Sequence, residues 1–158
     1  MEKKETVLIS ACLLGAATRY DGKSIVKIDL QKYKDKYNFI PICPEVYGGL
    51  PTPRTPSERV GDRVLMKTGE DVTESFLKGA MEAYRLALIF EAKIAVLKAK
   101  SPSCGKGKIY DGTFSGKLCE GNGVSAEYLI DRGICVIDEN EFFDMENRSE
   151  PLSNLLKK

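Results

Sequence analysis

The amino-acid sequence predicts an α/β protein: a single domain of Rossmann-like, three-layer architecture, in which a mainly parallel sheet of about four strands lies between helices. The first observation is periodicity, because short apolar runs rich in β-branched residues alternate with longer amphipathic stretches, as in a parallel sheet with helical crossovers. The second is composition, since 158 residues with 42% hydrophobic and 30% charged side chains suffice for one buried core.

Four apolar runs are predicted to form the strands, and they cover residues 6–10, 38–42, 93–98 and 133–137. Pro41, in the second run, has no amide hydrogen to donate to a neighbouring strand. We therefore expect the second strand at an edge of the sheet.

Three stretches between the strands are predicted as helices, over residues 24–37, 72–92 and 123–132. The second has the clearest helical repeat, because its apolar residues, among them Val72, Phe76, Ala80 and Ala87, fall on one stripe of a 3.6-residue period. The chain after Asp138 is expected to be a surface appendage, residues 139–158, on a core of about residues 7–138.

Two segments follow neither period: the proline-rich residues 48–69 and the glycine-rich residues 105–123. Long irregular loops in a compact domain are often functional. Asp111-Gly112, between Ile109-Tyr110 and Thr113-Phe114, predicts a small hairpin in the loop after the third strand.

Composition excludes several kinds of site and partner. The chain contains no histidine, which excludes Ser-His-Asp and Cys-His nucleophiles, His-rich zinc hydrolase sites and His-ligated haem. Its 24 basic and 23 acidic residues leave a net charge of +1, so no overall field favours a nucleic-acid partner. No apolar run approaches the roughly 20 residues of a membrane span, and the charged first residues are unlike a secretory signal. We expect a cytoplasmic protein.

Three of the five cysteines stand just beyond a predicted strand: Cys12, Cys43 and Cys104. Because the carboxyl ends of parallel strands share one edge of a sheet, we expect these thiols to meet there. Thiolates are soft ligands that suit iron–sulfur clusters. Cys135 lies inside the last strand and is expected in the core, whereas Cys119, in the glycine-rich loop, is left open as a fourth ligand or a free thiol.

The blocks around these three cysteines resemble the DUF523 family, which includes the thiouracil desulfidases. They read Ser-Ala-Cys-Leu-Leu-Gly at residues 10–15, Cys-Pro-Glu-Val-Tyr-Gly-Gly-Leu at 43–50 followed by Pro53-Arg54, and Ser-Pro-Ser-Cys-Gly at 101–105. The resemblance covers roughly residues 7–138, nearly the whole chain.

The resemblance implies that Cys12, Cys43 and Cys104 bind a [4Fe-4S] cluster and leave one iron without a protein ligand. It also implies that Glu45 and Ser101 lie beside that iron as the catalytic residues. The implied activity is the hydrolytic removal of sulfur from thiouracil or a thiolated pyrimidine nucleotide, with release of hydrogen sulfide. In this reaction Glu45 activates water and Ser101 binds the substrate or passes a proton.

We also expect Ser103 to contact the substrate, and Arg19, Lys106 and Lys108, which follow two of the cysteine loops, to bind a nucleotide phosphate. Two alternatives stay open at this point. The same site could desulfurate another small sulfur compound, or the chain could be a non-catalytic module that carries or senses a metal cluster. The oligomeric state is not predicted.

Overall fold

The computed structural model describes residues 3–24 and 26–157. Its strands are β1 (Glu5–Ser10), β2 (Tyr37–Ile42), β3 (Ser57–Val60), β4 (Arg63–Met66), β5 (Ile94–Leu97), β6 (Lys108–Tyr110), β7 (Leu118–Glu120) and β8 (Cys135–Asp138). Its α-helices are α1 (Leu30–Tyr33), α2 (Pro44–Tyr47), α3 (Thr73–Ile89), α4 (Val124–Asp131) and α5 (Glu139–Asn147). Two 3₁₀ helices are also present, η1 (Ala11–Leu13) after β1 and η2 (Leu152–Leu156) after α5. Among these residues no helix combines the length and the apolarity needed to cross a membrane.

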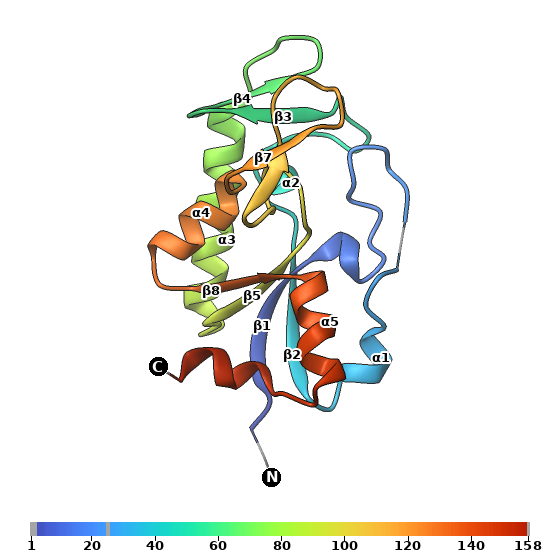
Figure 1. The fold of residues 1–158 in the computed structure, drawn as a ribbon, viewed down its shortest axis with the longest axis vertical. Coiled ribbons are helices and arrows are strands. Elements are labelled where there is room, and N and C mark those ends of the chain that lie inside the picture. Colours follow the sequence, from blue (N-terminus) through green and yellow to red (C-terminus); the bar gives the residue numbers. More distant parts are fainter. Residues whose placement is uncertain (1–2, 25, 158) are drawn as a thin grey trace.

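The centre of the fold is a parallel four-stranded sheet with the order β2-β1-β5-β8 (Figure 1). Each predicted strand overlaps one of these four, so the predicted sheet is confirmed. β2 lies at an edge, where Pro41 stands opposite Ile9 of β1, and the missing amide hydrogen costs no bond on the open side.

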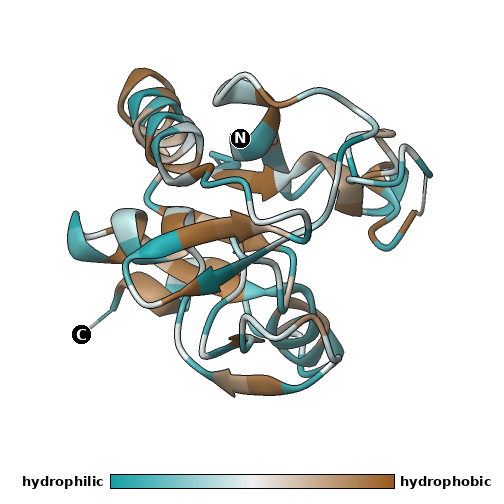
Figure 2. Ribbon diagram, turned by 90° about the horizontal axis from the view of Figure 1, so that it is seen from above, coloured by the Kyte–Doolittle hydropathy of each residue, from teal (hydrophilic) through white to brown (hydrophobic). Residues whose placement is uncertain are grey.

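Helices cover both faces of the sheet, as the three-layer prediction requires. Alternate strand residues point to opposite faces. One face packs against α1, α5 and η2 through a cluster that includes Val7, Ile9, Val96, Tyr33, Phe142 and Leu152. The other packs against α3 and α4 through Leu8, Ala95, Leu97, Ala83, Ala87 and Leu129. Figure 2 shows hydrophobic and hydrophilic residues alternating along the helices, as expected where a helix buries one side.

The C-terminal segment is part of the core, which corrects the expectation of a surface appendage over residues 139–158. Phe142 and Leu152 are fully buried and Met145 is 4% exposed. The Phe142 ring meets the Tyr33 ring edge-on at 5.2 Å between centroids. The physical reason is that α5 places its few apolar residues on one side, and that side closes the face of the sheet that α1 leaves open.

We expect Phe142→Ala to lower the free energy of unfolding by about 3–5 kcal/mol, because the substitution removes a buried ring and leaves a cavity. Urea denaturation of the purified protein measures the change. Leu156→Ala is the matched control, since this residue of η2 is 41% exposed, and a change within about 0.5 kcal/mol is expected there. Equal effects of the two substitutions would contradict the placement of α5 in the core.

The predicted helices differ in outcome. Residues 72–92 and 123–132 contain α3 and α4, so these two predictions are confirmed with shorter ends. The prediction for residues 24–37 is wrong over most of its length, because only Leu30–Tyr33 is helical. Before it Val26 forms an isolated antiparallel bridge with Leu14, and the amides of Lys27 and Ile28 donate to the Leu13 carbonyl. Ile25 lies outside the described residues.

Both irregular segments contain a two-stranded antiparallel sheet. β6 pairs with β7, which confirms a hairpin after the third strand of the main sheet, but Tyr110 pairs with Leu118, so the connection is longer than the predicted Asp111-Gly112 turn. The Asp111 carboxylate accepts a hydrogen bond from the Thr113 amide at 3.0 Å, which forms a local turn instead. The β3–β4 pair, in residues 48–69, was not predicted.

Two glycines allow α2 to lie directly against α3. A Cβ atom at Gly79 would lie 1.8 Å from the Pro44 carbonyl oxygen, and one at Gly48 would lie 2.0 Å from the Ser75 carbonyl oxygen. Both contacts are with backbone, which cannot rotate away as a side chain can. Because α2 begins directly after Cys43, this close packing determines where Cys43 and Glu45 lie.

Gly79→Ala is expected to destabilise the fold by about 1–3 kcal/mol, although alanine is the better helix former by about 1 kcal/mol. The added methyl group must push α2 away from α3. Thermal or urea unfolding measures the loss, and Lys78→Ala, at an exposed position of the same helix, is the control. A Gly79→Ala protein as stable as the wild type would show that the two helices are not in close contact.

Candidate functional site

A cavity of about 480 Å³ lies at the carboxyl end of the main sheet, within the roughly 300–1,000 Å³ range of ligand pockets. The side chains of Cys12, Cys43 and Cys104 line it. They come from the segments that follow β1, β2 and β5, three adjacent strands. The structure therefore brings together the three cysteines that the sequence places beyond successive strands.

The local structure after each strand places a cysteine at the carboxyl end of the sheet. Cys12 lies in η1, which begins as β1 ends, and Cys43 is the residue before the first turn of α2, with Pro44 at the first helical position. Cys104 lies in a tight turn in which the Ser101 hydroxyl oxygen accepts from the amides of Ser103 (3.1 Å) and Cys104 (3.0 Å). These turns fix the backbone on which the three thiols are carried.

Burial dominates the electrostatics of the thiols. It raises the pKa of Cys104 to about 12, against a hydrogen bond with Ser10 that lowers it, and the nearby Cys12 and Cys43 raise it further. Burial and Cys43 likewise raise the pKa of Cys12, while Lys98 and Arg19 oppose this shift. A positively charged metal group would displace the thiol protons and remove the cost of burying three thiolates together.

The donor set fits an iron–sulfur cluster better than a single ion. Across residues 3–24 and 26–157, no three His, Cys, Asp or Glu side chains stand close enough to hold one metal ion. Cys12, Cys43 and Cys104 nevertheless line one cavity, and Cys12 and Cys43 lie near enough to Cys104 to raise its pKa. A cluster of several irons spans a wider space than one ion, and thiolates are its usual ligands.

Glu45 lies in the first turn of α2 and also lines the cavity. Its Oε1 accepts from Arg54 Nε at 3.1 Å, and the two side chains are 17% and 3% exposed. Burial raises the pKa of Glu45, and the charge and hydrogen bond of Arg54 act in the opposite direction. A carboxylate held in this way is a stronger base than one in water.

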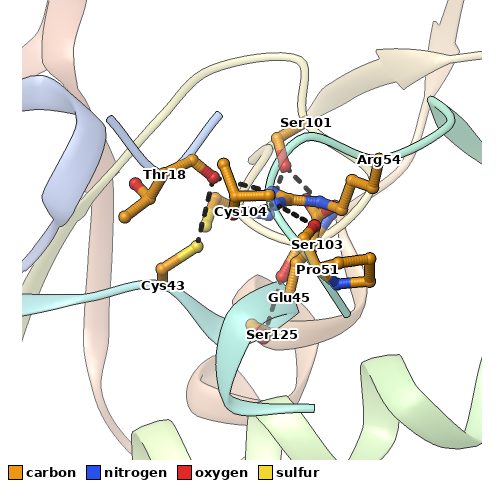
Figure 3. A network of polar contacts seen from close by, with 10 residues as sticks. Thr18, Cys43, Glu45, Pro51, Arg54, Ser101, Ser103, Cys104 and Ser125 are labelled. Atoms are coloured by element: carbon orange, nitrogen blue, oxygen red, sulfur yellow. Dashed lines mark hydrogen bonds and ion pairs between the residues drawn. The ribbon is translucent and has the colours of Figure 1, made fainter. Parts of the chain in front are cut away.

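Arg54 connects the walls of the cavity and was not assigned a role from the sequence. Beyond Glu45, its guanidinium donates to the Thr18 carbonyl (2.8 Å), the Pro51 carbonyl (3.2 Å) and the Thr52 hydroxyl (3.0 Å). The Cys43 thiol donates to the same Thr18 carbonyl at 3.8 Å (Figure 3). The sequence feature that could have identified Arg54 is its position, next to Pro53 and shortly after the block that contains Cys43 and Glu45.

The other predicted site residues divide into two groups. Ser101 and Arg19 line the cavity, and Arg19 forms an ion pair with Asp21 at 3.4 Å. Tyr110 and Phe114, which no sequence argument assigned, line it too.

Ser103, Lys106 and Lys108 are not among the described residues that line this cavity, so the structure does not bring these three predicted substrate contacts to it. Ser103 is 1% exposed and its hydroxyl donates to Ser125. Lys106 pairs with Glu141 at 3.2 Å, and Lys108 is exposed on β6. The turn around Cys104 is closed by a hydrogen bond from the Gly105 amide to the Ser101 carbonyl, and after Cys104 the next residue that lines the cavity is Tyr110.

Comparison with known proteins gives consistent matches. The 2-thiouracil desulfurase family matches residues 7–141. The uncharacterized protein YbbK of Bacillus subtilis (strain 168) is 40% identical over 149 residues, which are 88% of this chain and 99% of YbbK. A solved structure, the [4Fe-4S]-dependent thiouracil desulfidase TudS, superposes with a TM-score of 0.83 at 42% identity and covers 92% of this chain and 97% of its own.

Proposed function

Because the chain belongs to the 2-thiouracil desulfurase family, we propose that it hydrolyses the carbon–sulfur bond of thiouracil or of a thiolated pyrimidine nucleotide, with a [4Fe-4S] cluster as cofactor. The observation that supports this most directly is the meeting of Cys12, Cys43 and Cys104 in one cavity with Glu45. These cysteines are the proposed cluster ligands.

With three thiolate ligands, such a cluster supplies one iron without a protein ligand, a Lewis acid with an affinity for sulfur. The overall reaction needs no oxidant. Water supplies the oxygen of the new carbonyl group and two protons, the carbon–sulfur bond breaks, and the sulfur leaves as hydrogen sulfide.

Glu45 is the proposed general base. Its carboxylate takes a proton from the attacking water, and its raised pKa brings it closer to the range in which proton transfer is efficient. Arg54 holds the carboxylate in place by the Nε–Oε1 contact of 3.1 Å. Because that contact occupies Oε1, Oε2 is the oxygen proposed to receive the proton.

Ser101 is the proposed proton carrier on the substrate side. Its hydroxyl oxygen accepts from two backbone amides, of Ser103 and Cys104, so its own hydrogen is free to point into the cavity. Ser101 can therefore donate to a ring nitrogen or to the leaving sulfur. The phosphate of a nucleotide substrate has Arg19 as its proposed contact, the one predicted phosphate ligand that lines the cavity.

The test is sulfide release by protein reconstituted without oxygen. We expect 2-thiouracil or 4-thiouridine monophosphate to yield equal amounts of hydrogen sulfide and of the oxo-pyrimidine, with no turnover by the cluster-free protein. A loaded protein that acts only on other small sulfur compounds would change the proposed substrate. A loaded protein that releases sulfide from no compound would favour a sensing or carrier role.

A further inference from the structure

The loop between β6 and β7, residues 111–117, forms a wall of the cavity together with β3. In Figure 1 this loop, in orange, rises beside the β3–β4 hairpin at one end of the molecule. Ser57 and Glu58 of β3 line the cavity, and so do Tyr110, Phe114 and Gly116 from the end of β6 and the loop. Two of the three aromatic residues that line the cavity, Tyr110 and Phe114, therefore come from this part of the chain, and the third is Tyr20.

One carboxylate attaches this loop to β3. Glu58 is 8% exposed, and its Oε1 accepts from the amides of Gly112 (2.9 Å) and Phe114 (3.1 Å). The loop also packs tightly on the strand, since a Cβ atom at Gly112 would lie 2.5 Å from a methyl group of Val60. A buried carboxylate that binds two backbone amides holds the loop in one conformation.

Phe114 has a backbone conformation that phenylalanine rarely adopts. Its φ is 57°, in the left-handed region. Such a conformation persists only where the surrounding contacts require it, and here the hydrogen bond from the Phe114 amide to Glu58 is one such contact. Phe114 therefore combines this strained backbone with a position on the cavity wall.

We propose that Phe114 is the specificity-determining residue of the cavity, where its ring stacks on the planar base of the substrate, and that Glu58 is the positioning residue that holds Phe114 there. The inference rests on the proposed desulfuration of thiolated pyrimidines. Such stacking would give the cavity a preference for a flat heterocycle, because aromatic faces stack on planar rings.

The first experiment compares Phe114→Ala with Phe114→Tyr in reconstituted protein. We expect Phe114→Ala to raise the KM for 2-thiouracil about tenfold, with the smaller effect on kcat, and to weaken the binding of the product uracil by the same factor in calorimetry. Phe114→Tyr keeps the ring and is expected to retain most of the binding. Phe90→Ala is the control, because Phe90 is 47% exposed and is not among the residues that line the cavity.

The second experiment tests Glu58 without the cofactor. Glu58→Ala is expected to speed amide hydrogen exchange at Gly112 and Phe114 by roughly ten- to hundredfold, while Glu58→Gln, which keeps an acceptor oxygen, is expected to retain most of the protection. Glu70→Ala, at an exposed residue, is the control. In loaded protein, Glu58→Ala should raise KM, and adding it to Phe114→Ala should raise KM no further.

The outcomes separate this inference from the proposed function. Turnover by the wild type, with unchanged KM and uracil binding in Phe114→Ala, overturns the role of Phe114 and leaves the proposed function intact. Unchanged exchange at Gly112 and Phe114 in Glu58→Ala overturns the positioning role. A loaded wild type that binds uracil but releases no sulfide contradicts the proposed function only, and one that binds no pyrimidine contradicts both.

Discussion

Alanine in place of Cys12, Cys43 or Cys104 is expected to abolish cluster binding and sulfide release, each substitution on its own. Each change removes one of three thiolates, and the two that are left cannot compensate for the lost bond to iron. We expect iron and acid-labile sulfide per chain to fall to background after reconstitution. Turnover is expected to fall by at least about a hundredfold.

Cys119→Ala is the matched control, because this cysteine is exposed on β7 and does not line the cavity formed by the described residues. Its iron content and activity should equal those of the wild type. Circular dichroism confirms that each variant is folded before reconstitution. A Cys104→Ala protein with full iron content would remove Cys104 from the ligand set, and a loss of iron in Cys119→Ala would add a fourth ligand.

Glu45→Gln is expected to keep the cluster and lose turnover by about 10²- to 10⁴-fold, the usual contribution of general acid–base catalysis. Glutamine has nearly the same shape and can still accept from Arg54 through its amide oxygen, but it cannot take a proton from water. The iron content and the absorption spectrum should match those of the wild type while kcat falls.

The control for this substitution is Glu74→Gln, at an exposed position in the first turn of α3. It makes the same chemical change away from the cavity and is expected to leave kcat unchanged. Wild-type activity in Glu45→Gln would refute its role as the base and would direct attention to Ser101.

The parts of the fold that sequence analysis predicts are those with local signals. The four sheet strands are short apolar runs, and α3 carries an apolar stripe over its whole length, so periodicity alone indicates them. The helix predicted over residues 24–37 failed because its apolar residues serve different elements. The Ile28 amide donates to the carbonyl of Leu13, the last residue of η1, whereas Tyr33 belongs to α1 and Tyr37 begins β2.

The residues of the candidate site likewise divide into those with a local sequence signal and those without one. Cys12, Cys43 and Cys104 could be predicted because their position after a strand is visible in the local sequence. Arg54 and Glu58 could not, because Arg54 bonds to Thr18 across 36 positions, and Glu58 bonds to Gly112 across 54. In the sequence, Arg54 in a proline-rich segment and Glu58 in a short polar strand look like solvated side chains until the loops that they join are placed in space.

The strands that carry the three cysteines are neighbours in the sheet, but their separation along the chain determines when the cavity can exist during synthesis. Cys12 and Cys43 follow the first two sheet strands along the chain, but Cys104 follows only after α3 and β5 have been made. A nascent chain that ends before β5 is complete has at most two of the three thiols and neither Ser101 nor Phe114. The complete site is therefore a late product of translation and folding, because it depends on contacts between distant parts of the chain.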